Sequence, residues 1–86
     1  MAPAYSLHIT RFAQKELGSL PKIDYFRVKK AILSLSENPM PAGFRKLKGR
    51  DAYRIRCGDY RIIYEIHNDE LVIMVVRVAH RKDVYR

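Results

Sequence analysis

Arginines at alternate positions of one segment constrain the fold of this chain more than any other feature. In residues 53–57, read as YRIRC, Arg54 and Arg56 alternate with apolar side chains. Successive side chains of a β-strand point to opposite faces of a sheet, so this segment is predicted to be a strand with one apolar and one cationic face. Gly58-Asp59 favours a tight turn, after which the chain returns as a second strand and places Arg61 beside the other two arginines.

Three guanidinium groups on neighbouring strands repel one another unless an anion lies between them. Arginine forks match the geometry of phosphate and stay charged at any relevant pH, so they suit phosphate binding and charge stabilisation rather than proton transfer. We therefore interpret this face as a phosphate-handling surface. A solvated basic face without a ligand is the alternative, and the placement of the arginines in the middle of strands favours the first interpretation.

The rest of the chain predicts an α+β fold, with helices on one face of an antiparallel sheet of about four strands and the other face open. Alternating apolar residues at 5–9 indicate a short edge strand. Thr10 suits the N-cap of a helix over 11–17, and apolar residues at three- and four-residue spacing predict a second, antiparallel helix from Pro21 to Asn38. Residues 71–79 read as a central strand. The length, residues 1–86, predicts a single domain.

Charge and cysteine content narrow the class of partner. Seventeen Lys and Arg against nine Asp and Glu give a net charge of +8, which favours nucleic acid or an acidic protein over an anionic membrane. No apolar run approaches the roughly 18 residues that span a bilayer, and the first ten residues do not resemble an export signal, so we expect a cytoplasmic protein. The single cysteine, Cys57, forms no internal disulfide, and the three histidines lack metal-ligand spacing, so no metal site is predicted.

Two residues near the end of the chain are candidates for proton transfer. The pKa of a tyrosine is about 10 in water, and clustered positive charge stabilises its phenolate; Tyr85 follows Arg81 and Lys82 and precedes Arg86. His80 titrates nearest to neutral pH. Packing of the Tyr85 ring at the end of the sheet, and a surface role for His80, are the structural alternatives.

Four segments together resemble the RelE branch of the RelE/ParE toxin superfamily. They are Leu47-Lys48-Gly49, YRIR at 53–56, GDYRIIY at 58–64 and HRKDVYR at 80–86. Length and element order agree as well, so the resemblance covers the whole chain. It implies the toxin of a type II toxin–antitoxin system, acting without a cofactor as a ribosome-dependent mRNA endoribonuclease that stops translation.

The resemblance also implies the roles of individual residues. Tyr85 would help to remove the proton from a ribose 2′-hydroxyl, which attacks the adjacent phosphate in line. Arg61 and the strand arginines Arg54 and Arg56 would stabilise charge on phosphorus, and Arg81 would assist the departing 5′-oxygen. The best-known members carry lysines where this chain has Arg54 and Arg56, and arginine is a poorer proton donor. We therefore expect His80 to take part of the proton work.

Further basic residues are predicted to contact RNA, and the family resemblance implies the protein partners. The RNA-binding set is Arg45, Lys46, Lys48, Arg50, Arg77, Lys82 and Arg86. A RelB-like antitoxin would wrap the toxin, the complex would bind operator DNA, and the ribosome with its mRNA would be the target. Two other functions stay open at this point: a ParE-like inhibitor of DNA gyrase on the same fold, and a non-catalytic basic binding module.

Overall fold

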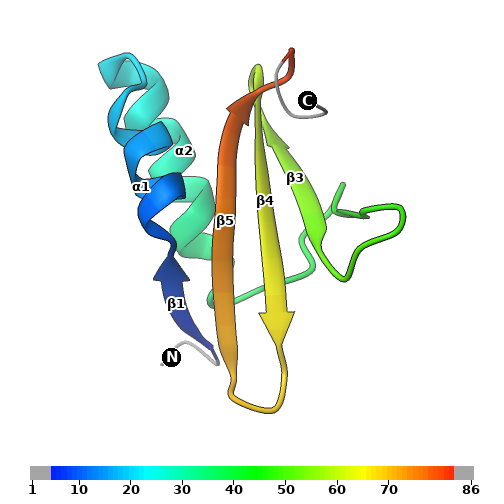
Figure 1. The fold of residues 1–86 in the computed structure, drawn as a ribbon. Coiled ribbons are helices and arrows are strands. Elements are labelled where there is room, and N and C mark those ends of the chain that lie inside the picture. Colours follow the sequence, from blue (N-terminus) through cyan, green and yellow to red (C-terminus); the bar gives the residue numbers. More distant parts are fainter. Residues whose placement is uncertain (1–4, 83–86) are drawn as a thin grey trace.

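The computed structural model describes residues 5–82, which form a mixed sheet and a pair of helices (Figure 1). The elements follow one another as β1 (Ser6–Ile9), α1 (Arg11–Gly18), α2 (Lys22–Ser34), β2 (Arg45–Lys46), β3 (Tyr53–Cys57), β4 (Tyr60–His67) and β5 (Val72–His80). This α+β architecture confirms the predicted fold class. No helix in the described part of the chain is long and apolar enough to cross a membrane.

The sheet has five strands in the order β1-β5-β4-β3-β2 and is not purely antiparallel. The prediction of an antiparallel sheet of about four strands was wrong on this point, because β1 pairs in parallel with β5, from Ser6 opposite Val72 to Ile9 opposite Val75. The remaining neighbours are antiparallel. β1 does lie at a sheet edge, as predicted. It covers the outer edge of the first half of β5, which would otherwise expose its backbone groups.

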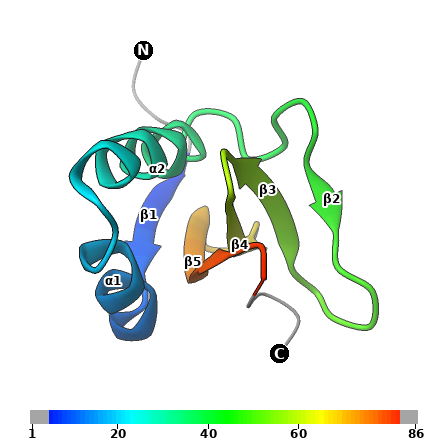
Figure 2. The same ribbon diagram turned by 90° about the horizontal axis from the view of Figure 1, so that it is seen from above.

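Both helices pack on the same face of the sheet, with β2 at the edge farthest from β1 (Figure 2). The hydroxyl of Thr10 accepts a hydrogen bond from the backbone N–H of Ala13 at 3.2 Å, which confirms the predicted N-cap of α1. The main core lies between the helices and the sheet. Its fully or nearly buried members are Ala13, Leu17, Val28, Ile32, Leu35, Ile55, Ile62, Tyr64, Ile73, Val75 and Val78.

A second, smaller apolar cluster lies on the other face of the sheet. Ala52, Ile63 and Ala79 are buried there, with Leu47 and Val76 packed against them. This face, predicted to be open, is therefore partly covered by the chain around β2. Side chains alternate between the two faces along β4: Ile63 belongs to this second cluster, whereas its neighbours Ile62 and Tyr64 belong to the main core.

Tyr64 ties the segment after α2 to the middle of the sheet. Its side chain is fully buried, and its hydroxyl donates a hydrogen bond of 2.6 Å to the carbonyl oxygen of Pro39. Burial, with the nearby Tyr53, raises the pKa of Tyr64 to about 12, so the phenol stays neutral and keeps its donor hydrogen. This bond positions the residues that lead from α2 into β2.

Replacing Tyr64 by Phe is expected to lower the free energy of unfolding by about 1–2 kcal/mol, because the Pro39 carbonyl loses its partner. The raised pKa of Tyr64 stabilises the wild-type fold below about pH 10, and this contribution is lost as pH rises towards 12. The stability of Tyr64→Phe should lack this pH dependence, because phenylalanine does not ionise. Denaturant titrations at neutral and alkaline pH measure both effects. At neutral pH Tyr53→Phe is the matched control, since the Tyr53 hydroxyl makes no hydrogen bond within residues 5–82. An equal loss in both variants at neutral pH would contradict the assignment.

Candidate functional site

The register of β3 and β4 brings the predicted arginines together on the face that the helices leave uncovered. Arg56 lies opposite Arg61, and Arg54 lies opposite Ile63 of the smaller cluster. Directly paired residues of an antiparallel sheet point to the same face. On the outer side of β3, Arg45 is the partner of Arg54, so four arginines from three adjacent strands share one surface.

The surroundings of these arginines differ. The Arg54 side chain is enclosed, with only 8% of its surface exposed, whereas Arg56 is exposed and Arg61 is half-buried. The Nε atom of Arg61 is buried and has no hydrogen-bond partner among residues 5–82. Guanidinium groups stay charged even when desolvated, and a buried donor without a partner is unfavourable. A negatively charged oxygen beside Arg61 would satisfy this donor.

The chain beyond β5 returns to the same end of the sheet. The backbone N–H of Arg81 donates a hydrogen bond of 2.8 Å to the carbonyl oxygen of Asp59, in the turn between β3 and β4. Arg81 and Lys82 are both exposed. This bond holds the start of the C-terminal segment beside the hairpin that carries Arg56 and Arg61. Tyr85 and Arg86 lie outside the described residues.

The structure does not bring His80 together with the arginines. His80 is the register partner of Tyr60, and the two rings pack edge to face with centroids 5.6 Å apart. The Tyr60 hydroxyl in turn donates a hydrogen bond of 3.3 Å to the Asp24 carboxylate on α2, so this pair faces the helices. Desolvation and then the Asp24 carboxylate raise the pKa of Tyr60. His80 is the last residue of β5 and faces the helix side of the sheet, whereas Arg81 lies in the turn beyond the strand.

The other predicted RNA-binding residues fall into two groups. Arg45, Lys46, Lys48 and Arg50 are all exposed on β2 and the turn that follows it. Arg45 shares the face of Arg54 and extends the basic surface, whereas Lys46 is the partner of Tyr53 and points to the helix side of the sheet. Arg77 instead contacts α1: its guanidinium group lies 5.2 Å from the centre of the Phe12 ring and forms an ion pair with Glu16. The positive charge of Arg77 is therefore largely balanced by Glu16 within the protein.

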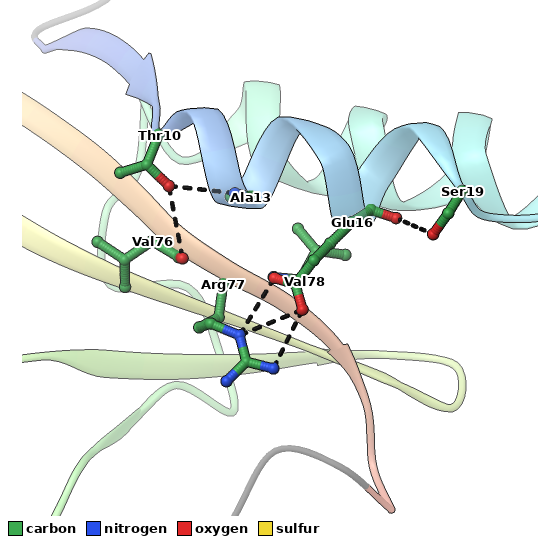
Figure 3. A network of polar contacts seen from close by, with 7 residues as sticks. All are labelled: Thr10, Ala13, Glu16, Ser19, Val76, Arg77 and Val78. Atoms are coloured by element: carbon green, nitrogen blue, oxygen red, sulfur yellow. Dashed lines mark hydrogen bonds and ion pairs between the residues drawn. The ribbon is translucent and has the colours of Figure 1, made fainter. Parts of the chain in front are cut away.

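Glu16 organises the edge of β5 beyond the end of β1 (Figure 3). Its carboxylate accepts hydrogen bonds from Nε of Arg77 at 3.2 Å, Nη2 of Arg77 at 3.1 Å and the backbone N–H of Val78 at 2.8 Å. The Thr10 hydroxyl donates to the Val76 carbonyl at 3.5 Å. Side chains of α1 and its cap therefore replace the missing strand neighbour. No sequence pattern indicated this role for Glu16, which reads as an ordinary helix-surface acid.

A pocket of about 440 Å³ lies beside β3, between the end of α2 and β2, and was not predicted. Its lining residues are Ala31, Ser34, Pro41, Ala42, Gly43, Arg45, Arg54, Ile55 and Arg56. Within residues 5–82 no group of three or more His, Cys, Asp or Glu side chains is placed to hold a metal ion. The chemistry that the described residues offer is the binding of an anion and the stabilisation of developing negative charge.

The chain is similar to several known toxins. A family model described as the ParE toxin of the type II toxin–antitoxin system parDE matches residues 7–85. Toxin RelG of Mycobacterium tuberculosis is 34% identical over 86 residues, covering 95% of this chain and 97% of RelG. The archaeal RelE–RelB complex from Pyrococcus horikoshii OT3 superposes with a TM-score of 0.82 at 33% identity, covering 94% of this chain and 99% of that chain. The isolated E. coli RelE toxin superposes with a TM-score of 0.78 at 30% identity, covering 95% and 92%.

Loss of the Glu16 carboxylate is expected to loosen the β5 edge. Glu16→Ala removes hydrogen bonds to a guanidinium group and to a backbone N–H, so the free energy of unfolding should fall by about 2 kcal/mol. Hydrogen exchange of the Val78 amide should accelerate more than that of Ile62, which lies inside the sheet. Glu37→Ala, at an exposed acid, is the control. Unchanged Val78 exchange in Glu16→Ala would show that the carboxylate does not protect this edge.

Proposed function

Because the chain belongs to the ParE toxin family of type II toxin–antitoxin systems and is RelE-like in sequence and fold, we propose that it is a ribosome-dependent endoribonuclease that cuts mRNA. The observation that carries this proposal is the arginine surface around Arg61, whose buried Nε lacks a partner among the described residues. A phosphate oxygen of a bound RNA would satisfy this donor. The proposed toxin domain is residues 1–86.

In the proposed reaction the RNA supplies its own nucleophile. The ribose 2′-oxygen forms a bond to the adjacent phosphorus as its proton leaves, and the bond from phosphorus to the 5′-oxygen of the next nucleotide breaks. The departing 5′-oxygen takes a proton from solvent, so the products are a 2′,3′-cyclic phosphate and a 5′-hydroxyl. Arg61, with Arg54 and Arg56, stabilises the charge on the phosphate oxygens, and Arg81 assists the departing oxygen. RNA is required because DNA has no 2′-hydroxyl group.

The proton from the 2′-hydroxyl is assigned to Tyr85 in this proposal. Tyr85 lies outside the described residues, and its role comes from the family resemblance. His80 is the weaker candidate, since its ring packs on Tyr60 at the helix side of the sheet. Its Nδ1 atom also accepts a hydrogen bond of 3.3 Å from the backbone N–H of Lys82. We therefore do not include His80 in the proton transfer.

The shape of the site supports the proposed dependence on the ribosome. The arginines lie on one face of a small sheet, and Arg56, Lys48 and Arg50 are exposed, so residues 5–82 do not enclose a nucleotide on all sides. In-line attack requires the 2′-oxygen, the phosphorus and the leaving oxygen to be aligned. We propose that the ribosomal decoding site supplies this alignment and the toxin supplies the charge.

The proposed protein partner is a RelB-like antitoxin. The P. horikoshii structure is a complex of RelE with RelB, and so is the intact E. coli RelBE structure, which is 30% identical to this chain. A net charge of +8 favours an acidic, partly disordered antitoxin segment that folds on the cationic face. We further propose that the toxin–antitoxin complex binds operator DNA.

Inhibition of DNA gyrase is the second candidate function, and the ParE description of the matching family model favours it. It is distinguished by its target: a gyrase inhibitor would leave ribosome-bound mRNA intact. It would also tolerate loss of Arg61, whose desolvated Nε then has no catalytic use.

Arg61→Gln is expected to slow the cleavage of ribosome-bound mRNA by roughly 10²- to 10³-fold, because it removes one preorganised charge donor from the transition state. Ribosome affinity should change much less. Single-turnover primer extension measures the rate, and sedimentation with ribosomes measures binding. Lys22→Gln, at the exposed start of α2, loses the same charge away from the site and should cut like the wild type. A wild-type cleavage rate in Arg61→Gln would contradict the catalytic role and favour the interpretation of the arginines as a solvated basic face.

Tyr85→Phe and His80→Gln separate the two candidates for proton transfer. We expect Tyr85→Phe to remove most cleavage activity at neutral pH, with the fold intact, and His80→Gln to cut within a few-fold of the wild type. With Tyr85 as the base, the rate should rise with pH until the phenol ionises and should show no inflection near pH 6.5, the ordinary pKa of a histidine. The reverse order of the two variants would place His80 in the reaction.

A further inference from the structure

The pocket beside β3 is adjacent to the arginine site but distinct from it. β2 is only two residues long and pairs with Tyr53 and Arg54, so the outer edge of β3 has no strand partner from Ile55 onward. The pocket occupies this gap. Its walls come from the last turn of α2, the Pro41-Ala42-Gly43 segment, and β2.

All charged side chains that line the pocket are positive. Arg45, Arg54 and Arg56 line it, and none of its lining residues is acidic. The C-terminal end of a helix carries partial negative charge on its free carbonyl groups. Here those groups are occupied, because the Ser34 hydroxyl donates to the Ala31 carbonyl at 2.7 Å and the backbone N–H groups of Glu37 and Asn38 donate to the Ser34 carbonyl. The arginines therefore dominate the electrostatics of the pocket.

Arg56 belongs both to the pocket and to the arginine site. It lines the pocket and is the register partner of Arg61. Adjacent strands lie about 4.8 Å apart, and Arg61 lies two residues, about 7 Å, along β4 from Ile63, the residue in line with Arg45 and Arg54. Arg45 on β2 is therefore roughly 12 Å from Arg61 on β4. A phosphate bound near Arg45 is then too far away to be the one held by Arg61, but it is within reach of the same RNA strand.

We propose that this pocket binds the phosphate of a nucleotide next to the cleavage position and so fixes the register of the RNA strand on the sheet. The inference rests on the proposed ribonuclease function and deepens it. A volume of about 440 Å³ leaves room for the ribose that carries the phosphate, against the apolar surfaces of Ala31, Pro41 and Ile55. Guanidinium forks bind phosphate in a bidentate manner, and continuity with Arg61 through Arg56 favours RNA over an acidic peptide.

Two variants test the pocket in different ways. Arg45→Gln removes one charge, and Ala42→Phe fills the pocket while keeping every arginine; Arg45 and Ala42 are both exposed, so neither change disturbs the core. Lys22→Gln is the control for charge, since it lies roughly 13 Å from Ala31 along α2. Thermal unfolding verifies that each variant is folded.

The probe is a short RNA with a 2′-O-methyl group on every ribose, which cannot be cut because its nucleophile is blocked. In NMR titrations the amides of Gly43, Ile55 and Arg56 should shift. Affinity should fall about 3- to 10-fold in Arg45→Gln and in Ala42→Phe, and not in Lys22→Gln. The slope of log affinity against log salt should decrease by about 0.7 in Arg45→Gln, the value for one phosphate contact with a single strand.

Cleavage of ribosome-bound mRNA separates failure of the pocket from failure of the proposed function. If both pocket variants cut mRNA like the wild type and bind RNA with unchanged affinity, the proposed phosphate pocket is wrong and the proposed function stands. The predicted losses of RNA affinity, in a protein that cuts no ribosome-bound mRNA, would support the pocket and contradict the function. If a glutamate-rich peptide shifts the pocket amides and the RNA does not, the pocket is a peptide site and the inference is wrong.

Discussion

The alternation of side chains along β3 and β4 couples the core of this protein to its functional surface. Ile55, Ile62 and Tyr64 point into the main core under the helices, and the same alternation sends Arg54, Arg56 and Arg61 to the opposite face. A shift of one residue in either strand would bury arginines and expose the core, so the register is strongly specified. The burial of apolar side chains that stabilises the sheet therefore also holds the like-charged arginines side by side.

Placing these charges together opposes folding, and other contacts offset the effect. Arg56 and Arg61 lie directly opposite one another, an arrangement that is unfavourable for like charges. The two-sided burial of β4 and β5, with Ile63 and Ala79 on the arginine face, stabilises the strands that carry them. Glu16 completes the edge of β5 and holds Arg77 away from the cluster. In such an arrangement an anionic ligand relieves repulsion that the free protein retains.

Local signals predicted the hairpin, the helix starts and the arginine surface, because each depends on neighbours in sequence. The Gly58-Asp59 turn fixes the pairing of Arg56 with Arg61, and Thr10 caps α1 by accepting a hydrogen bond from Ala13, three residues later. Contacts between distant segments were not predictable in the same way. The parallel pairing of β1 with β5 joins residues more than 60 positions apart, and Glu16 reaches Arg77 over a similar separation. The pocket likewise requires α2, β2 and β3 to be placed relative to one another. The catalytic roles of the arginines and of Tyr85 stay predictions.

The most direct test of the proposed chemistry is the structure of the ends that the toxin leaves on ribosome-bound mRNA. The proposed mechanism uses only the 2′-hydroxyl of the RNA as nucleophile, with charge stabilisation from Arg61 and its neighbours. Mass spectrometry of the purified fragments should find a 2′,3′-cyclic phosphate on the upstream piece and a 5′-hydroxyl on the downstream piece. A 3′-hydroxyl and a 5′-phosphate would show that water attacks the phosphate from outside the RNA and would contradict the mechanism.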